Sequence, residues 1–207
     1  MTASVAPVGS GSPPDRLFPL KARLLAVKRI VQNLLSSDKP VAWRRDNVTI
    51  GETLARDVSP LYTARDPREF ALELGKVQNL RVAAKRLDGL VFDTGELFSF
   101  WHVIGRPTRS RGFVEGRELR QGCLIPTIAG GICQMTNALS CVVEQAGMEI
   151  VERHRHSATV DGLALDPKTD ATVFWNYVDF RFRAARPIRL TTRLTRDNLE
   201  VVIDALA

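Results

Sequence analysis

Apolar residues recur at helical spacing near the start of the chain. Residues 17–35 carry leucine, valine or isoleucine three and four positions apart, interleaved with lysine and arginine. This pattern predicts a basic amphipathic helix that ends before Asp38-Lys39-Pro40. Such a helix packs its apolar side on a domain or lies on an anionic membrane surface as a peripheral contact, and we expect packing on the domain.

A second helix is predicted between residues 66 and 89. Asp66 supplies an N-cap carboxylate, Pro67 suits the first helical position, and Glu69 completes a capping box. Apolar positions then repeat with helical period up to Leu87, and Gly89 is the expected C-cap. Residues 41–65, before this helix, are expected to be irregular, with short strands only around 47–50.

Alternating apolar and polar residues dominate the C-terminal part of the chain. They predict strands over 97–103, 148–154, 171–177, 180–183, 188–195 and 199–206, the last two joined as a hairpin. Residues 104–128 are punctuated by glycines and are expected to be mostly loop. The order of elements indicates an α+β fold, with N-terminal helices and a cysteine-bearing central helix packed on a mostly antiparallel C-terminal sheet. We expect a disordered segment at 1–15, the basic helix at 16–40 and a single domain at 41–207.

The most distinctive stretch is Ala129-Gly130-Gly131-Ile132-Cys133, followed by an apolar-periodic run that stops at Gly147. The two glycines permit a sharp turn that brings Cys133 to the first turn of a helix. Backbone N–H groups at a helix N-terminus favour the thiolate over the thiol and can stabilise an oxyanion. A small buried cysteine at a tight turn is the simpler alternative.

A cysteine nucleophile needs a base and a group that orients the base. His154 and His156 follow the helix and, two residues apart on a predicted strand, point to one side, so that either can serve as the base. Asp170 begins the next predicted strand and can orient it. The same cysteine, histidine and aspartate types also suit zinc, but H-x-H is the only short ligand pair, and we expect no metal.

Composition narrows the range of partners. The formal charge of +6 comes mostly from arginines scattered along the chain, and no RNA-binding motif is present, so no nucleic-acid partner is expected. Three cysteines without a C-x-x-C pair argue against a structural zinc site or a disulfide framework, and we expect no cofactor. No secretory signal or membrane-spanning run is visible, which taken alone predicts a cytoplasmic location.

Five motifs together resemble the VanW family, named for vancomycin-resistance clusters. They are K-V-Q-N-L-R-V-A-A-K-R-L (76–87), G-E-L-F-S-F-W (95–101), G-G-I-C-Q-M-T-N (130–137), E-R-H-R-H-S (152–157) and D-A-T-V (170–173). The family pattern usually reads G-G-G-x-C-Q-x-S, whereas this chain has Ala129 and Thr136 at the first glycine and the serine. We expect Ala129 to be tolerated unless its φ must be positive.

The resemblance implies cysteine-dependent acyl transfer on peptidoglycan stem peptides or their precursors, of the L,D-transpeptidase kind, linked to cell-wall remodelling or glycopeptide resistance. By position it implies that Cys133 is the nucleophile, His156 the base and Asp170 the orienting carboxylate. Substrate-binding or oxyanion roles are implied for Gly131, Gln134, Trp101, Arg153 and His154. Because cross-linking takes place outside the membrane, this function requires an export route that the sequence does not show.

A different class of function is a non-catalytic binding module associated with the cell wall or with glycopeptides. In that case Cys133 is only a packed residue at the turn, and binding survives its replacement by serine.

Overall fold

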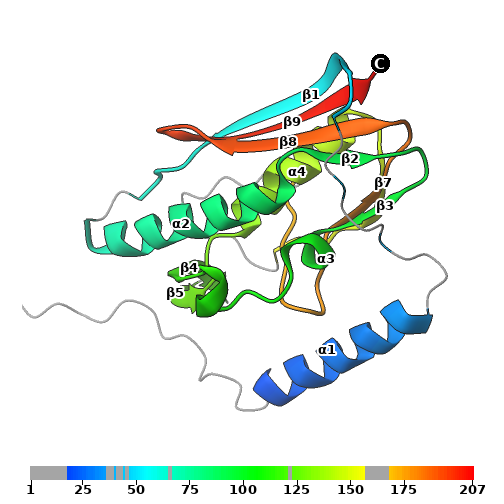
Figure 1. The fold of residues 1–207 in the computed structure, drawn as a ribbon. Helices are drawn as coiled ribbons and strands as arrows, with labels where there is room; N and C mark the ends of the chain where they lie inside the picture. The colour runs from blue at the N-terminus through cyan, green and yellow to red at the C-terminus, as the bar shows by residue number, and fades with distance from the viewer. Residues whose placement is uncertain are drawn as a thin grey trace, which may run out of the picture.

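The computed structural model describes residues 18–35, 40, 44, 47–64, 67–120, 123–156 and 168–207, so the segment 1–15 lies outside the described residues. The protein has an α+β fold (Figure 1). The helices are α1 (Phe18–Leu35), η1 (Pro67–Glu69), α2 (Phe70–Leu87), α3 (Phe100–Ile104), η2 (Arg109–Arg111) and α4 (Cys133–Gln145). The strands are β1 (Ile50–Pro60), β2 (Leu90–Phe92), β3 (Leu97–Ser99), β4 (Glu115–Arg120), β5 (Cys123–Ile128), β6 (Glu149–Glu152), β7 (Arg181–Arg183), β8 (Ile188–Leu194) and β9 (Asn198–Leu206).

The described strands form three antiparallel sheets. A four-stranded sheet has the order β1-β9-β8-β2, a three-stranded sheet the order β3-β7-β6, and β4 pairs with β5 as a separate hairpin. Helices α2 and α4 cover one face of the four-stranded sheet, and the β4–β5 hairpin lies on the other side of α2 (Figure 1). The four-stranded sheet joins distant parts of the chain. Strand β1 pairs with β9, which lies at the C-terminus.

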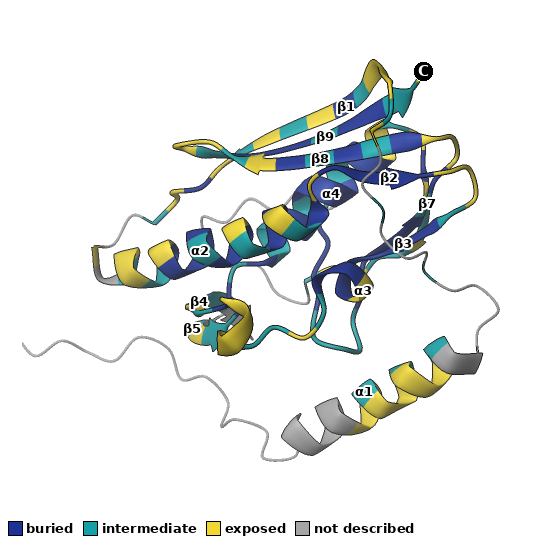
Figure 2. Ribbon diagram, in the orientation of Figure 1, coloured by how far each residue is buried: buried dark blue, intermediate teal, exposed yellow. Residues whose placement is uncertain are grey.

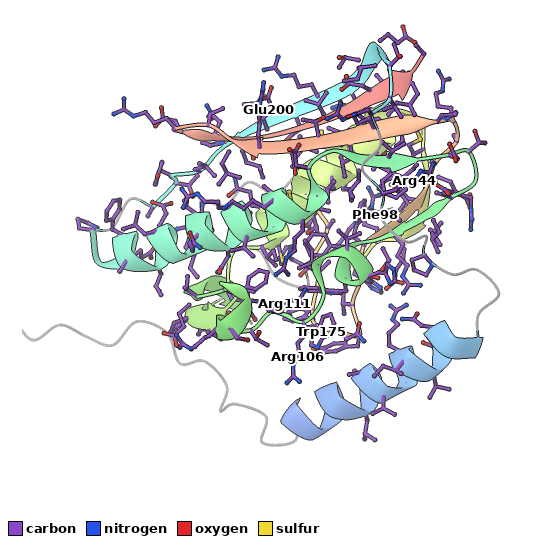
Figure 3. All side chains as sticks on the ribbon, in the orientation of Figure 1. Arg44, Phe98, Arg106, Arg111, Trp175 and Glu200 are labelled. Carbon is purple, nitrogen blue, oxygen red and sulfur yellow. The ribbon has the colours of Figure 1, made fainter. Side chains whose placement is uncertain are left out.

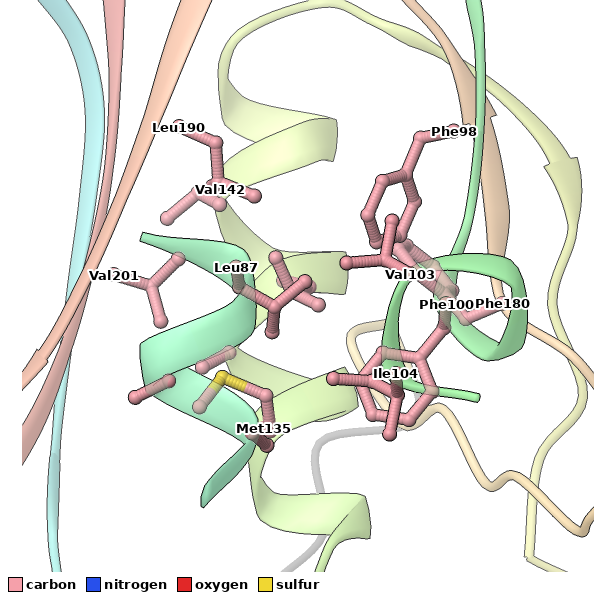
Figure 4. Packing of buried hydrophobic residues seen from close by; sticks show 14 of the residues in the cluster. Leu87, Phe98, Phe100, Val103, Ile104, Met135, Val142, Phe180, Leu190 and Val201 are labelled. Carbon is pink, nitrogen blue, oxygen red and sulfur yellow. The ribbon is translucent and has the colours of Figure 1, made fainter. Parts of the chain in front are cut away.

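The core lies between the two larger sheets and surrounds α4. Met135 of α4 and Leu87 of α2 lie between Val201 of β9 and the α3 residues Phe100 and Ile104 (Figure 4). All five of these side chains are fully buried, as expected for apolar residues at helical and strand periods. Stacked phenylalanine rings of β3 and β7 close the far end of the core.

The structure confirms several predicted elements. The helices predicted from 17, 66 and 133 are α1, α2 and α4, and Gly89 and Gly147 adopt positive φ just beyond α2 and α4. The strands predicted over 180–183, 188–195 and 199–206 are β7, β8 and β9.

Other predictions were wrong where the chain lacks a core-facing pattern. The irregular segment expected before residue 65 is largely β1, an edge strand in which Ala55 alone is buried, so that no alternating apolar signal exists. The loop expected over 104–128 contains the β4–β5 hairpin. The aromatic strand expected over 97–103 turns into α3, because the Ser99 hydroxyl caps the helix by accepting from the backbone N–H of His102. Residues 171–177 form isolated bridges rather than a strand.

The start of α2 also differs from the predicted capping box. Asp66 lies outside the described residues, and Glu69 stands at the N-cap without a capping hydrogen bond from its side chain. The Glu69 carboxylate instead pairs with Arg117 of β4 at 3.2 Å. This ion pair holds the β4–β5 hairpin against the start of the helix.

The sequence predicted that α1 packs its apolar side on the domain, and this prediction was wrong. Its described apolar side chains are exposed, and it contacts the remainder of the protein through Arg29 and Asn33 (Figure 2). No helix in the described parts of the chain combines the length and apolar character needed to cross a bilayer.

Candidate active site

The loop before α4 makes a tight turn that places Cys133 as the first residue of the helix. Ala129 and Gly131 both adopt positive φ, at 65° and 85°. The turn is fixed to the β4–β5 hairpin, because the Ala129 N–H donates to the Val114 carbonyl at 3.1 Å and the Gly130 N–H to Thr127 at 2.9 Å. Ala129 therefore occupies, with a left-handed backbone, the position at which the family pattern usually has glycine.

Close packing requires glycine at both positions, and at Gly131 the positive φ favours glycine as well. A Cβ on Gly131 would overlap the aliphatic stem of Lys76, and a Cβ on Gly130 would overlap the backbone of Gly116. The turn thus lies directly on α2 and β4. A side chain at either position would displace the helix start that carries Cys133.

Asn79 of α2 clamps the same turn with its side-chain amide. Its Nδ2 donates to the carbonyls of Gly130 and Val114, each at 3.0 Å, and its Oδ1 accepts from the Val114 N–H at 2.9 Å. Asn79 is fully buried, and its bond to the Gly130 carbonyl is shielded from water. The motif over 76–87 thereby acquires a physical role, because Lys76 and Asn79 form the surface on which the turn rests.

His156 and Asp170 form a buried pair. His156 Nδ1 lies 2.6 Å from Asp170 Oδ1, and the His156 backbone N–H donates to Asp170 Oδ2 at 2.8 Å. The side chains are 13% and 7% exposed. Two bonds to one carboxylate fix both the position and the orientation of the imidazole, and leave Nε2 as the ring nitrogen that can face a reacting group.

The sulfur of Cys133 meets this pair. A hydrogen bond between the Cys133 side chain and the imidazole is the largest cause that raises the pKa of His156 to about 9; the bond to Asp170 acts in the same direction, and burial opposes both. The Cys133 Sγ also lies 3.6 Å from the Thr172 hydroxyl. The Cys133 sulfur, the His156 imidazole and the Asp170 carboxylate thus form one connected row of side chains.

Two side chains of α4 hold the Asp170 segment beside the cysteine. The Thr136 hydroxyl, fully buried, donates to the Ala171 carbonyl at 2.5 Å, and the Ala171 N–H donates to Asn137 Oδ1 at 2.7 Å. Thr172 continues the connection, since its N–H donates to the His154 carbonyl at 2.8 Å. These roles of Thr136, Asn137 and Thr172 were not predicted, although all three residues lie in the motifs at 130–137 and 170–173.

The structure places four other predicted site residues in structural contacts. Gln134 Nε2 donates to Ser59 Oγ at 3.0 Å and to the Pro60 carbonyl at 2.9 Å, which ties α4 to the end of β1. Trp101 is buried, and its indole N–H donates to the Val178 carbonyl at 2.9 Å. Arg153 bonds Ser140 at 3.1 Å and pairs with Glu144 at 3.3 Å. The His154 ring is half-exposed and lies 3.1 Å from Glu152 Oε1, apart from the His156–Asp170 pair.

A buried ammonium group lies beneath the glycine turn. Lys76 is 4% exposed, and its Nζ lies 3.7 Å from Glu73 Oε1. Burial and the charge of Arg117 lower the pKa of Lys76 to about 8, while Glu73 acts in the opposite direction. Lys76 lies at helical spacing from Leu80 and Leu87, on the buried side of α2. This spacing could have predicted a buried lysine, but the prediction was not made.

The positions of the cysteines also bear on metal binding. Among the described residues, no group of three histidine, cysteine or acidic side chains is arranged to hold a metal ion. Cys133 and Cys141 are both half-buried, and Cys141 accepts a hydrogen bond from Gln145 at 3.0 Å and bonds the Asp57 side chain. Figure 3 shows the described side chains as sticks on the ribbon; the labelled Trp175 packs edge to face on Trp101, with ring centroids 5.4 Å apart.

Comparison with known proteins identifies relatives of the chain. A family model described as VanW like protein matches residues 75–204. The chain is 38% identical to "Uncharacterized protein YoaR" of Bacillus subtilis over 51% of its own length and 34% of that protein. It is 27% identical to "Vancomycin B-type resistance protein VanW" of Enterococcus faecalis over 69% of its length and 53% of that protein. The chain therefore spans about a third and about half of these curated relatives. No solved structure matches it.

Proposed function

The chain belongs to the VanW family, and from this premise we propose that it is a cysteine-dependent acyltransferase that acts on peptidoglycan stem peptides. The observation that supports this proposal is the contact of Cys133 with His156, whose other ring nitrogen is fixed on Asp170. A packed structural cysteine has no need of an oriented imidazole.

The electrostatics of the pair favour a protonated imidazole beside the sulfur. With a pKa of about 9, His156 is protonated at neutral pH. A protonated ring against the sulfur stabilises a thiolate, and the position of Cys133 at the start of α4 adds the positive end of the helix dipole. Thr172 supplies a hydroxyl that can donate to the same sulfur.

The reaction begins with attack by the Cys133 thiolate on the amide carbonyl carbon that follows the third residue of a stem peptide. The Sγ–C bond forms, and the carbonyl electron pair moves to oxygen. The backbone N–H of Cys133, which has no hydrogen-bond acceptor among the described residues, is the natural donor to this oxyanion.

Collapse of the tetrahedral intermediate breaks the C–N bond. Protonated His156 gives its proton to the departing amine, the terminal D-alanine, and a thioester remains on Cys133. Neutral His156 then takes a proton from an incoming amine of a second stem as this amine attacks the thioester carbon. The S–C bond breaks, and the Cys133 thiolate and protonated His156 are restored. If water attacks instead, the same steps give hydrolysis.

The choice of substrate class rests on the relatives. One relative is named for vancomycin resistance. Acyl transfer on the cell wall is what the resemblance of the motifs to the VanW family implies. Because the chain spans only part of these relatives, the stem peptide and the acceptor amine belong to the proposal.

Intact-mass spectrometry after incubation with a disaccharide tetrapeptide tests the proposal. The wild-type protein should gain the mass of the disaccharide tripeptide acyl group, with release of D-alanine, and Cys133→Ala should gain nothing. Cys141→Ala is the matched control, because it removes another half-buried thiol of the same helix, and it should behave as wild type.

Absence of a mass gain, together with tetrapeptide binding that survives Cys133→Ser, would instead favour the non-catalytic binding module. A gain that persists in Cys133→Ala would assign the chemistry to another residue. Circular dichroism of each variant shows whether the fold is retained.

A further inference from the structure

Helix α1 exposes an apolar surface that nothing in the described structure covers. We call this surface the α1 apolar stripe and define it by Leu24, Val27 and Val31, which are 64%, 58% and 47% exposed. Figure 2 shows that the described part of α1 is exposed along most of its length. Positions three and four residues apart lie on one side of a helix, so these side chains form a continuous strip.

The side of α1 that meets the protein is roughly opposite the stripe. Arg29 donates to Glu152 Oε2 at 2.8 Å and to the Tyr177 carbonyl at 3.3 Å, and Asn33 accepts from Arg181 at 2.9 Å. With a rotation of about 100° per residue, Arg29 and Asn33 lie on the far side of the helix from Leu24 and Val31. The polar contacts therefore hold α1 so that the stripe points away from the domain.

Charge distinguishes this surface from an ordinary exposed apolar patch. Helix α1 contains four basic residues, Lys21, Arg23, Lys28 and Arg29, and no acidic one. By helical period the positions of Lys21 and Lys28 flank the stripe on one side and that of Arg23 on the other. Cations beside an apolar strip match the boundary between lipid headgroups and acyl chains.

We propose that α1 is a peripheral membrane-binding helix that lies flat on a bilayer with anionic lipids. The stripe enters the boundary between headgroups and acyl chains, and the flanking cations meet lipid phosphates, while Arg29 and Asn33 keep the helix attached to the domain. A second copy fits less well, because paired α1 helices bring basic side chains together and offer no carboxylate to neutralise them.

Vesicle co-sedimentation of the full chain tests this inference. We expect binding to vesicles of equal parts phosphatidylglycerol and phosphatidylcholine to be at least about tenfold tighter than to phosphatidylcholine alone, and to weaken as salt screens the charges. Leu24→Glu should lower the partition coefficient at least about tenfold, because it removes a leucine that would be buried in the bilayer and adds a negative charge. Lys28→Glu should weaken binding to the anionic vesicles only.

Leu74→Glu is the matched control, since Leu74 is a leucine exposed to 47% on a different helix, α2. It should leave the partition coefficient unchanged within about twofold. Equal sedimentation of wild type and Leu24→Glu, or no binding to either vesicle, would overturn the inference. Sedimentation velocity that shows a concentration-dependent dimer abolished by Leu24→Glu would overturn it too, and would assign the stripe to a second copy. None of these outcomes depends on the acyltransferase proposal.

Discussion

At the scale of single residues, the proposed chemistry depends on which atoms surround one sulfur. Cys133 and Cys141 lie on the same helix and are similarly buried, but their contacts differ: Cys133 meets the His156 imidazole, whereas Cys141 bonds the side chains of Gln145 and Asp57. Exposure therefore cannot explain a difference in their reactivity. The surroundings of Cys133 combine an imidazole, a hydroxyl and a helix N-terminus.

Thr172 is expected to orient the sulfur. Thr172→Val keeps the shape of this buried side chain but removes the hydroxyl that lies 3.6 Å from Cys133 Sγ. Since one hydrogen bond contributes about 1 kcal/mol, iodoacetamide should alkylate Cys133 about three- to tenfold more slowly in this variant. Thr172→Ser should retain the wild-type rate within about twofold. A rate for Thr172→Val that equals the wild-type rate would show that the hydroxyl has no such role.

His156 makes stability depend on pH. Its pKa is raised from 6.5 to about 9 in the folded protein, so its contribution is fully present below about pH 6.5 and is lost as the pH rises through about 9. The difference in unfolding free energy between wild type and His156→Gln should reach about 3 kcal/mol near pH 6 and shrink toward pH 10. Urea denaturation across this range measures it. A difference that grows with pH would contradict the assigned contacts.

At the scale of elements, the turn before α4 explains which positions tolerate change. Gly131→Ala puts a Cβ into the buried stem of Lys76 at a positive φ and should lower the unfolding free energy by at least about 2 kcal/mol. Ala129→Gly relieves strain at a positive φ but removes a buried methyl group, so its effect should stay within about 1 kcal/mol. Urea denaturation separates the two. Equal effects would mean that the Lys76 contact does not constrain the turn.

The same turn shows how far sequence reasoning extends. Glycine next to glycine before a periodic run predicts a turn and a helix start, because both depend on local conformation. The support from Asn79 and Gly116 joins residues far apart in the chain, and no local pattern records it. Strand β1 was missed for a related reason, since an edge strand with one buried side chain has no alternating pattern to detect.

At the scale of the whole molecule, the site is assembled from segments that the two larger sheets and α4 hold together. Motif order left His154 and His156 both open as the partner of Cys133 and Asp170, and the family resemblance implied His156. The structure brings the side chains of Cys133, His156 and Asp170 together. The contacts of Gln134, Arg153 and Trp101 depend on β1, on α4 and on the core, respectively. Sequence spacing cannot distinguish these structural contacts from contacts to a substrate, because residues of both kinds lie near the motifs.

The fold also separates the two surfaces for which functions are proposed. The Cys133 site is built on α4, α2 and the segment around Asp170, whereas α1 joins the protein through Glu152 and Arg181. Variants of the α1 apolar stripe should therefore leave the reactivity of Cys133 unchanged. This separation allows the two proposals to be tested independently in the same protein.

The rate of alkylation of each cysteine in the folded protein tests the central claim most directly. Peptide mass spectrometry after timed exposure to iodoacetamide near pH 7 follows Cys123, Cys133 and Cys141 in one sample. The account predicts that Cys133 reacts at least about tenfold faster than the other two and that His156→Gln removes most of this advantage. Equal rates for the three thiols, or a Cys133 rate that does not change in His156→Gln, would contradict it.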